Sequence, residues 1–265
     1  MLLANKNAVV YGAGGAIGRA VARAFAEDGA TVYLAGRTGA PLEAVAAEIN
    51  GAGGTAHAAV VDALDEQAVD DHLDAIAAEA GRIDVSFNLI SHGDVHGVPL
   101  LDISAEDFSR PIEIATVGNF HTMRSAARRM VKQQSGVILT LTSPPAKLVG
   151  PLMGGTAVAE AAVETFTRCL AAEIGLHGVR VLGLRSEGIP GAWAEDWHTN
   201  VFDTPVEATD GLDPEGHANV LADRTMLQRT PTLAEMTAVA VFLASDRAAA
   251  MTGTITNMTC GSVPD

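Results

Sequence analysis

Hydrophobic positions along the chain follow two patterns in turn, one typical of buried strands and one typical of amphipathic helices. Short apolar runs bounded by polar or glycine residues, such as residues 8–11 and 31–35, predict buried strands. Between these two runs, Ile17, Val21 and Phe25 recur at i, i+4 and i+8, which predicts an amphipathic helix that ends at Gly29. The first part of the chain therefore has the order strand, helix, strand.

The same alternation continues to the C-terminus. Further strands are expected at residues 55–61, 83–90, 137–141, 179–184 and 254–258, and helices at residues 42–51, 69–81, 157–174 and 232–243. A long helical stretch should start at Ser104 and be broken or restarted by Pro111. Regular alternation predicts an α/β fold with a Rossmann-type, doubly wound parallel sheet of about seven strands. We expect one domain over residues 1–265, with residues 187–230 as a small, irregular substrate lobe over the carboxyl ends of the strands.

Composition narrows the class of partner. The net charge of −15 argues against nucleic acid and anionic membrane surfaces. No stretch of about twenty residues is uniformly apolar, and from the first residues we expect no signal peptide. The two cysteines, Cys169 and Cys260, make no disulfide framework and fit a reducing compartment. We expect a cytoplasmic protein that acts on a small molecule.

A glycine-rich turn joins the first strand to the first helix. The residues Gly12-Ala13-Gly14-Gly15-Ala16-Ile17-Gly18 follow the strand without a gap. Glycines allow the backbone to bend tightly and approach a pyrophosphate, which the free N–H groups at the helix start can bind. This context predicts a dinucleotide site that includes Gly12, Gly14, Gly15, Ile17 and Gly18.

The end of the second strand indicates which dinucleotide binds. An acidic residue there would accept hydrogen bonds from the adenosine ribose of NAD. This chain instead has Gly36 followed by Arg37 and Thr38, and a guanidinium can bind a 2′-phosphate. NADP(H) is the predicted cofactor, and the alternative is that Arg37 is an ordinary surface arginine.

These motifs together resemble the short-chain dehydrogenase/reductase family over nearly the whole chain. The glycine turn is similar to the family's TGxxxGxG, Asp62-Ala63 to its adenine-binding pair, and Asn88 to the first residue of its NNAG motif. Phe242-Leu243-Ala244-Ser245-Asp246 followed by Thr252-Gly253 is similar to its C-terminal FLxSD…TG. The resemblance implies nicotinamide cofactor contacts at Asp62, Ala63 and Asn88. It also implies a homo-oligomer, a tetramer or dimer, that pairs through residues 112–132 and 157–174 and through the last strand.

The catalytic positions depart from the family pattern. The family serine is followed by Tyr thirteen residues later and by Lys four residues after that. Ser143 fits the serine, but the tyrosine position holds Thr156, the lysine position Glu160, and the position of the helix asparagine Ala115. The resemblance therefore implies a divergent member that lacks the Tyr-x3-Lys pair.

This departure changes the expected chemistry. Carbonyl reduction needs a proton for the developing alkoxide, and threonine is too weak an acid to replace tyrosine. A carboxylate at Glu160 would favour the cationic, oxidised nicotinamide over the reduced ring. The alternative is that Glu160 pairs with a lysine or arginine, or hydrogen-bonds the ribose hydroxyls.

A histidine-rich loop offers another donor. His92, Asp94 and His96 follow the fourth strand, on a loop that in this fold approaches the nicotinamide pocket. Three interpretations stay open: a polar solvated loop, a proton donor with His92 as first candidate, and a metal site. The spacing is a weak metal signal, and we expect no metal.

The predicted lobe carries information about the substrate. It contains Trp193, Trp197 and Phe202, and residues 187–216 contain several acidic residues and no Lys or Arg. This composition disfavours a CoA thioester or phosphorylated substrate and favours a neutral or cationic, partly aromatic one. The alternative is a solvated acidic rim in which the tryptophans form the lobe's core.

Two classes of function remain open from the sequence. The first is an atypical NADP(H)-binding oxidoreductase with a non-standard proton donor. The second is a protein of the same fold without redox activity, either a binding or regulatory subunit or a non-redox catalyst that keeps the nucleotide site.

Overall fold

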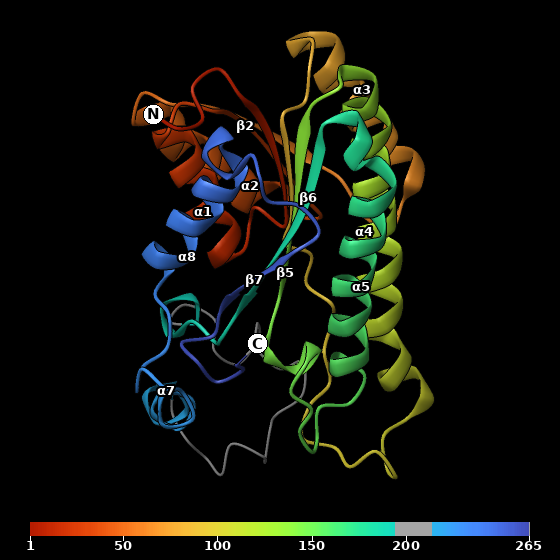
Figure 1. The fold of residues 1–265 in the computed structure, drawn as a ribbon, viewed down its shortest axis with the longest axis vertical. Coiled ribbons are helices and arrows are strands. Elements are labelled where there is room, and N and C mark those ends of the chain that lie inside the picture. The colour runs from red at the N-terminus through yellow and green to blue at the C-terminus, as the bar shows by residue number, and fades with distance from the viewer. Residues whose placement is uncertain (194–213, 265) are drawn as a thin grey trace.

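The computed structural model describes residues 1–193 and 214–264, in which a parallel sheet is covered by helices on both faces (Figure 1). Its strands are β1 (Asn7–Tyr11), β2 (Thr31–Gly36), β3 (Thr55–Val60), β4 (Val85–Asn88), β5 (Gly136–Thr142), β6 (Val179–Ser186) and β7 (Ile255–Met258). The order is β3-β2-β1-β4-β5-β6-β7, and every neighbouring pair is parallel. The predicted doubly wound sheet of seven strands is confirmed.

The longer helices form two layers. Figure 1 shows α1 (Ala16–Glu27), α2 (Gly39–Gly51) and α8 (Leu233–Ala244) on one face of the sheet, and α3 (Glu66–Ala80), α4 (Ala105–Gln133) and α5 (Thr156–Ile174) on the other. Short 3-10 turns lie at η1 (Pro144–Ala146), η2 (Gly175–His177), η3 (Pro190–Ala192) and η5 (Asp246–Ala248). Each face of the sheet buries its own hydrophobic cluster, so the strands carry apolar residues on both sides.

Pro111 does not break α4, contrary to the sequence prediction. The helix runs unbroken through it, and its start is capped by Ser104, whose Oγ accepts from the N–H of Asp107 (3.0 Å). Proline removes one backbone donor, but Pro111 is buried, and a Cβ on Gly155 would lie 3.0 Å from its Cγ. The helix thus tolerates Pro111 at a position that packs closely against Gly155, the residue just before α5.

The segment predicted to be a small, irregular lobe contains a helix. Within residues 187–230 the structure places α7 (Pro214–Asp223) and η3. A Cβ on Gly188 would lie 2.8 Å from Cδ1 of Leu221, so α7 lies close to the chain that leaves β6. The helix α7 thus packs beside the chain that follows the carboxyl end of β6.

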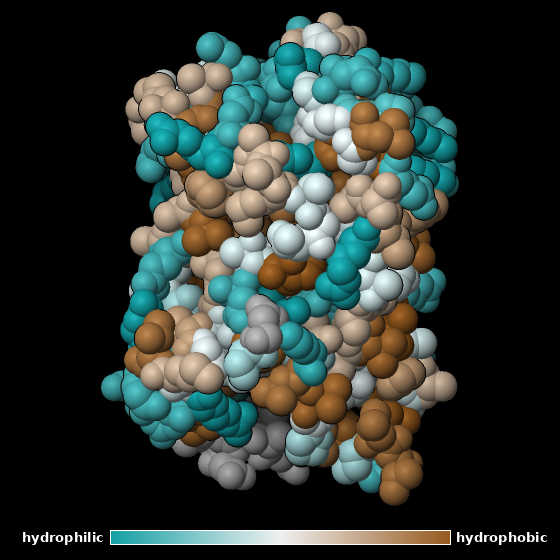
Figure 2. All heavy atoms as spheres, viewed as in Figure 1, coloured by the Kyte–Doolittle hydropathy of each residue, from teal (hydrophilic) through white to brown (hydrophobic). Residues whose placement is uncertain are grey.

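The outer face of α4 and α5 is apolar. A shallow cavity of about 380 Å³ there is lined by Ala115, Thr116, Val117, Asn119, Phe120, Ala162, Val163 and Phe166. Phe120 is 42 % exposed, and Figure 2 shows hydrophobic side chains on this side of the molecule. Within the described residues, no helix combines the length and apolar character needed to cross a bilayer.

Candidate functional site

Two adjoining cavities lie at the carboxyl edge of the sheet. The glycine-turn cavity, about 490 Å³, is bordered by Gly12, Gly14, Arg37, Asp62 and Ala63 among others. The Ser143 cavity, about 350 Å³, is lined by Gly18, His92, Ser143, Glu160 and Trp193 among others. Both walls include Gly12, Gly15 and Leu89, so the cavities meet at the glycine turn.

The glycine turn is shaped for close backbone approach. A Cβ on Gly12, whose φ is +75°, would lie 2.0 Å from the Leu89 carbonyl oxygen, and one on Gly18 would lie 2.2 Å from the Gly12 oxygen. Gly15 begins α1 without a side-chain cap, which leaves N–H groups of the first helical turn available to a phosphate. Gly14 lines the glycine-turn cavity, and Ile17 lines the Ser143 cavity. These features fit the phosphates of a dinucleotide.

The predicted adenosine-side residues line one cavity. Arg37, Thr38, Asp62 and Ala63 all border the glycine-turn cavity. Arg37 is exposed and makes no hydrogen bond or ion pair with any described residue, so its guanidinium is available to an anion. Asp62 accepts from the N–H of Leu64 (3.0 Å), which holds its carboxylate at the cavity edge.

Asn88 lies deeper than the other predicted cofactor residues. It is buried at the end of β4, where Nδ2 donates to the Leu139 carbonyl oxygen (3.3 Å). Its Oδ1 has no partner among the described residues. Its visible role is to tie β4 to β5 beneath the two cavities.

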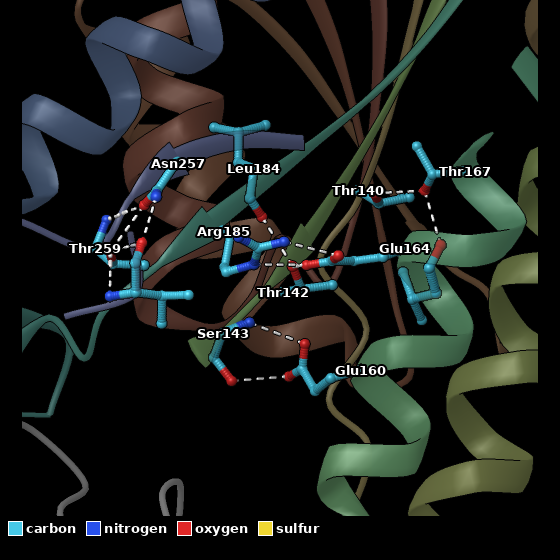
Figure 3. A network of polar contacts seen from close by, with 12 residues as sticks. Thr140, Thr142, Ser143, Glu160, Glu164, Thr167, Leu184, Arg185, Asn257 and Thr259 are labelled. Atoms are coloured by element: carbon cyan, nitrogen blue, oxygen red, sulfur yellow. Dashed lines mark hydrogen bonds and ion pairs between the residues drawn. The ribbon is translucent and has the colours of Figure 1, made fainter. Parts of the chain in front are cut away.

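Three polar contacts connect β5 to α5 and form a ladder (Figure 3). Thr140 pairs with Thr167 (Oγ1–Oγ1 3.0 Å), and Thr142 donates to Glu164 (3.2 Å). At the cavity end, Ser143 donates to Glu160 from both its N–H (2.9 Å) and its Oγ (3.1 Å). The ladder aligns the end of the strand with the first turns of the helix and brings Ser143 and Glu160 together.

Glu160 is buried and holds its proton unusually strongly. The pKa of Glu160 is raised from 4.5 to about 8, mainly by burial. The hydrogen bonds from Ser143 oppose this rise, and the nearby Asp94 charge adds to it. At pH 7 the group is therefore mainly a neutral carboxylic acid in the protein alone. The effect of a Glu160 carboxylate on the nicotinamide, as expected from the sequence, therefore applies when the group ionises near pH 8.

Behind Glu160 lies a buried ion pair. Arg185 at the end of β6 donates to both carboxylate oxygens of Glu164, from Nε (2.7 Å) and from a terminal nitrogen (2.8 Å). Both side chains are 4 % exposed. The bidentate geometry compensates the Glu164 charge and fixes the middle of the ladder.

Thr156 is engaged by the histidine-rich loop. Its Oγ1 lies 2.7 Å from Nε2 of His96 and donates to Oδ1 of Asp94 (2.9 Å). Thr156 is buried, and it is not among the described residues that line the Ser143 cavity. The hydroxyl thus holds the loop onto the start of α5.

His92 and Asp94 line the Ser143 cavity, as the sequence suggested for this loop. Burial lowers the pKa of His92, and of His96, by more than the Asp94 carboxylate raises it. Both rings are therefore neutral near pH 7. Among the described residues, no group of three or more His, Cys, Asp or Glu side chains is placed to hold a metal ion.

Of the three aromatic lobe residues, Trp193 is buried and forms part of the Ser143 cavity wall. Trp197 and Phe202 lie outside the described residues. Glu187 also lines this cavity, with its carboxylate accepting from the N–H of Gly188 (3.0 Å) and from Oγ of Ser262 (2.6 Å).

Sequence reasoning missed the roles of Glu164, Arg185 and Glu187. Charged residues inside an apolar strand or an otherwise apolar helix face were the available signal, because such charges need a partner when buried. The partner of Glu187, Ser262, is far away in sequence and gave no local signal.

Comparisons with known proteins agree with this geometry. The family model "short chain dehydrogenase" matches residues 6–199. The chain is 31 % identical to D-threitol dehydrogenase of Mycolicibacterium smegmatis, covering 95 % of this chain and 90 % of that one. It is 28 % identical to 7alpha-hydroxysteroid dehydrogenase of Escherichia coli K12, covering 99 % and 96 %.

Solved structures show the same arrangement. An NAD⁺-bound xylitol dehydrogenase superposes with a TM-score of 0.88 at 26 % identity, over 98 % of this chain and 100 % of that one. A short-chain type dehydrogenase/reductase from Mycobacterium marinum gives 0.83 at 28 % identity, over 99 % and 97 %.

Proposed function

This chain belongs to the short-chain dehydrogenase family, and we propose that it is an NADP(H)-dependent oxidoreductase in which Ser143 and Glu160 handle the proton. The observation that carries the proposal is the hydrogen-bonded Ser143–Glu160 pair in the wall of a cavity that adjoins the glycine turn. The cavity adjoins the glycine turn, whose geometry suits a dinucleotide, and this neighbourhood supports a role for the pair in hydride chemistry.

The proposed reaction follows from the positions of these groups. When bound, the nicotinamide dinucleotide supplies or accepts a hydride. Ser143 Oγ–H orients the reacting heteroatom of the substrate and transfers a proton to it, and the carboxyl group of Glu160 replaces that proton on Oγ. In the oxidative direction the same pair carries the proton away from the substrate. General acid catalysis of this kind contributes about 10²–10⁴-fold.

We propose that the chain works without the family's tyrosine and lysine. Its tyrosines are Tyr11 in β1 and Tyr33 in β2, and the Tyr11 hydroxyl is fully buried without a partner among the described residues. Burial also raises the pKa of Tyr11, which makes it a still weaker acid. His92, the donor suggested from the sequence, lines the same cavity, but its neutral ring is a weaker acid than the Glu160 carboxyl group.

The preference for NADP(H) rests on Arg37. Its guanidinium borders the glycine-turn cavity, forms no ion pair within residues 1–193 and 214–264, and suits a 2′-phosphate. The residues Gly36-Arg37-Thr38 at the end of β2 include no acidic residue to bind a ribose. The xylitol dehydrogenase structure holds NAD⁺, so the NADP(H) preference proposed for this chain differs from the cofactor bound in that structure.

Binding without turnover is the second candidate function. The observation that favours it is the Thr156 hydroxyl, which is committed to Asp94 and His96 on the loop rather than facing the Ser143 cavity. In that case the protein would keep the nucleotide as a structural or regulatory ligand.

One experiment separates the two candidates. Purified protein is titrated with NADPH and then incubated with NADPH, or with NADP⁺, and a panel of ketones, imines, alcohols and amines. Micromolar binding with substrate-dependent change in absorbance at 340 nm, lost in Ser143→Ala and kept in Ser135→Ala, supports the oxidoreductase. Binding with no turnover across the panel supports the second candidate.

A further inference from the structure

The Ser143 cavity has an unusual charge balance. Its described lining includes the carboxyl groups of Asp94, Glu160 and Glu187, and no lysine or arginine. None of the three forms an ion pair with a described lysine or arginine. Their hydrogen-bond donors are neutral: Thr156 for Asp94, Ser143 for Glu160, and Gly188 with Ser262 for Glu187.

From this balance, and resting on the proposed function, we propose that the substrate of the Ser143 cavity is a carbon–nitrogen double bond, reduced as its protonated iminium form to an amine. A cation bound there would supply the missing positive charge. Trp193 adds an aromatic surface to the same wall, which suits an organic cation.

The step balances in atoms and charge. The imine nitrogen takes the proton of Ser143 Oγ–H, and Oγ takes the proton of the Glu160 carboxyl group. The iminium carbon then accepts a hydride from the reduced nicotinamide, and the π-electron pair moves to nitrogen as a lone pair. The products are a neutral amine, the oxidised dinucleotide and the Glu160 carboxylate. The positive charge passes from the substrate to the nicotinamide. The carboxylates of the cavity therefore stabilise the iminium cation before the hydride transfer and the nicotinamide cation after it.

Basicity distinguishes this substrate class from ketones. An imine nitrogen is an sp² base comparable to imidazole, whose pKa is near 6.5. A carboxyl group with its pKa raised to about 8 can share a proton with such a nitrogen. A ketone oxygen is a far weaker base and needs a proton only as the alkoxide forms, which is the role of the family's tyrosine.

The groups that face Glu160 agree with this assignment. Asp94 approaches it from the loop after β4, and Glu164 lies one turn along α5 with its charge compensated by Arg185 of β6. His92 shares the cavity wall as a neutral ring. Among the described residues, Arg185 and Arg168 both form ion pairs with Glu164.

The test uses three probes of nearly the same shape with NADPH: 3,4-dihydroisoquinoline, its permanently charged N-methyl iminium salt, and 1-tetralone. The expected result is reduction of both nitrogen compounds at least about tenfold faster than the ketone, a difference equivalent to about 1.4 kcal/mol. Glu160→Gln should lose reduction of the neutral imine above pH 7 but still reduce the N-methyl salt, which needs no proton. Glu187→Gln should raise KM for the salt several-fold. Glu173→Gln, an exposed change on the same helix, is the control.

The outcomes distinguish this proposal from the function on which it rests. Ketone reduction as fast as imine reduction would overturn the substrate class and leave the oxidoreductase standing. Equal loss of both nitrogen substrates in a folded, NADPH-binding Glu160→Gln protein would overturn the proton route. Binding of NADPH with no reduction of any probe, or of the wider panel, would overturn both.

Discussion

Ser143 donates two hydrogen bonds to Glu160, one from its backbone N–H and one from its hydroxyl, across the junction of β5 and α5. Both contacts fall on a carboxyl group that burial keeps protonated to about pH 8. A serine hydroxyl backed by a neutral acid can pass a proton, which neither residue could do as well alone.

Arg37 should determine the choice of cofactor. We expect NADPH to bind at least about tenfold more tightly than NADH, because a guanidinium–phosphate contact is charge-assisted. Arg37→Asp should abolish the preference, whereas Arg247→Asp, the same charge change at an exposed site on η5, should keep it. Cofactor fluorescence titration measures both. Equal affinities in the unmodified protein would show that Arg37 does not bind the 2′-phosphate.

Glu160→Gln should change how folding stability depends on pH. In the folded protein the carboxyl group keeps its proton to about pH 8, against 4.5 for an exposed glutamate. Its stabilising contribution is therefore fully present below pH 4.5 and is lost as the pH rises through about 8. Between these two pH values, the free energy of unfolding of the unmodified protein should fall, relative to that of the variant, by up to about 1.4 kcal/mol per pH unit.

The variant gives up one acceptor for Ser143, about 1 kcal/mol, so it should be less stable at pH 4 and more stable at pH 8. Urea unfolding at pH 4, 6 and 8 checks the crossing, with Glu173→Gln as the control. Parallel stability profiles for Glu160→Gln and the unmodified protein would contradict the raised pKa.

The same titration should appear in cofactor binding. Above about pH 8 the Glu160 anion should favour the cationic nicotinamide, so the affinity for NADP⁺ should rise relative to NADPH between pH 7 and 9. The ratio should stay flat in Glu160→Gln. Isothermal titration at several pH values measures it, and a flat ratio in the unmodified protein would place Glu160 away from the nicotinamide.

The buried Glu164–Arg185 pair should be costly to break. Arg185→Met leaves a buried carboxylate without its bidentate partner and should destabilise the fold by about 3–5 kcal/mol. Arg185→Met combined with Glu164→Gln should recover much of that loss. Lys6→Met, which removes the solvent-exposed pair with Asp246, should change stability by less than about 1 kcal/mol. Chemical denaturation measures all three; a double variant no better than Arg185→Met would argue against the ion pair as the cause.

The apolar face of α4 and α5 should be covered by a second copy of the chain. Exposed Phe120 and the shallow cavity between the helices form an apolar patch on an otherwise acidic protein. We expect a dimer or tetramer at micromolar concentration by light scattering. Ala162→Glu, in this cavity, should dissociate it, and Leu176→Glu, at an exposed site, should not. A monomer in the unmodified protein would rule out this assembly.

The strand and helix order, the parallel sheet and the glycine turn follow from the sequence because they depend on neighbouring residues. Apolar periodicity decides which face of each element is buried, and alternating strands and helices have few ways to pack. Gly12 and Gly18 could be identified because they lie in a glycine-rich turn between a predicted strand and a predicted helix. Pro111 shows where local reasoning fails, since its packing against Gly155 lies in another helix.

The chemistry of the site was decided by the tertiary structure. Position in a motif identified Thr156 and Glu160, but only the fold turns Thr156 towards Asp94 and His96 and gives Glu160 its partner in Ser143. The protonation of Glu160 depends on burial, which no local pattern contains. Glu187 enters the cavity wall through a contact with Ser262, 75 residues along the chain. Residue type and spacing thus determined which groups are available, and long-range packing determined which of them form hydrogen bonds with one another.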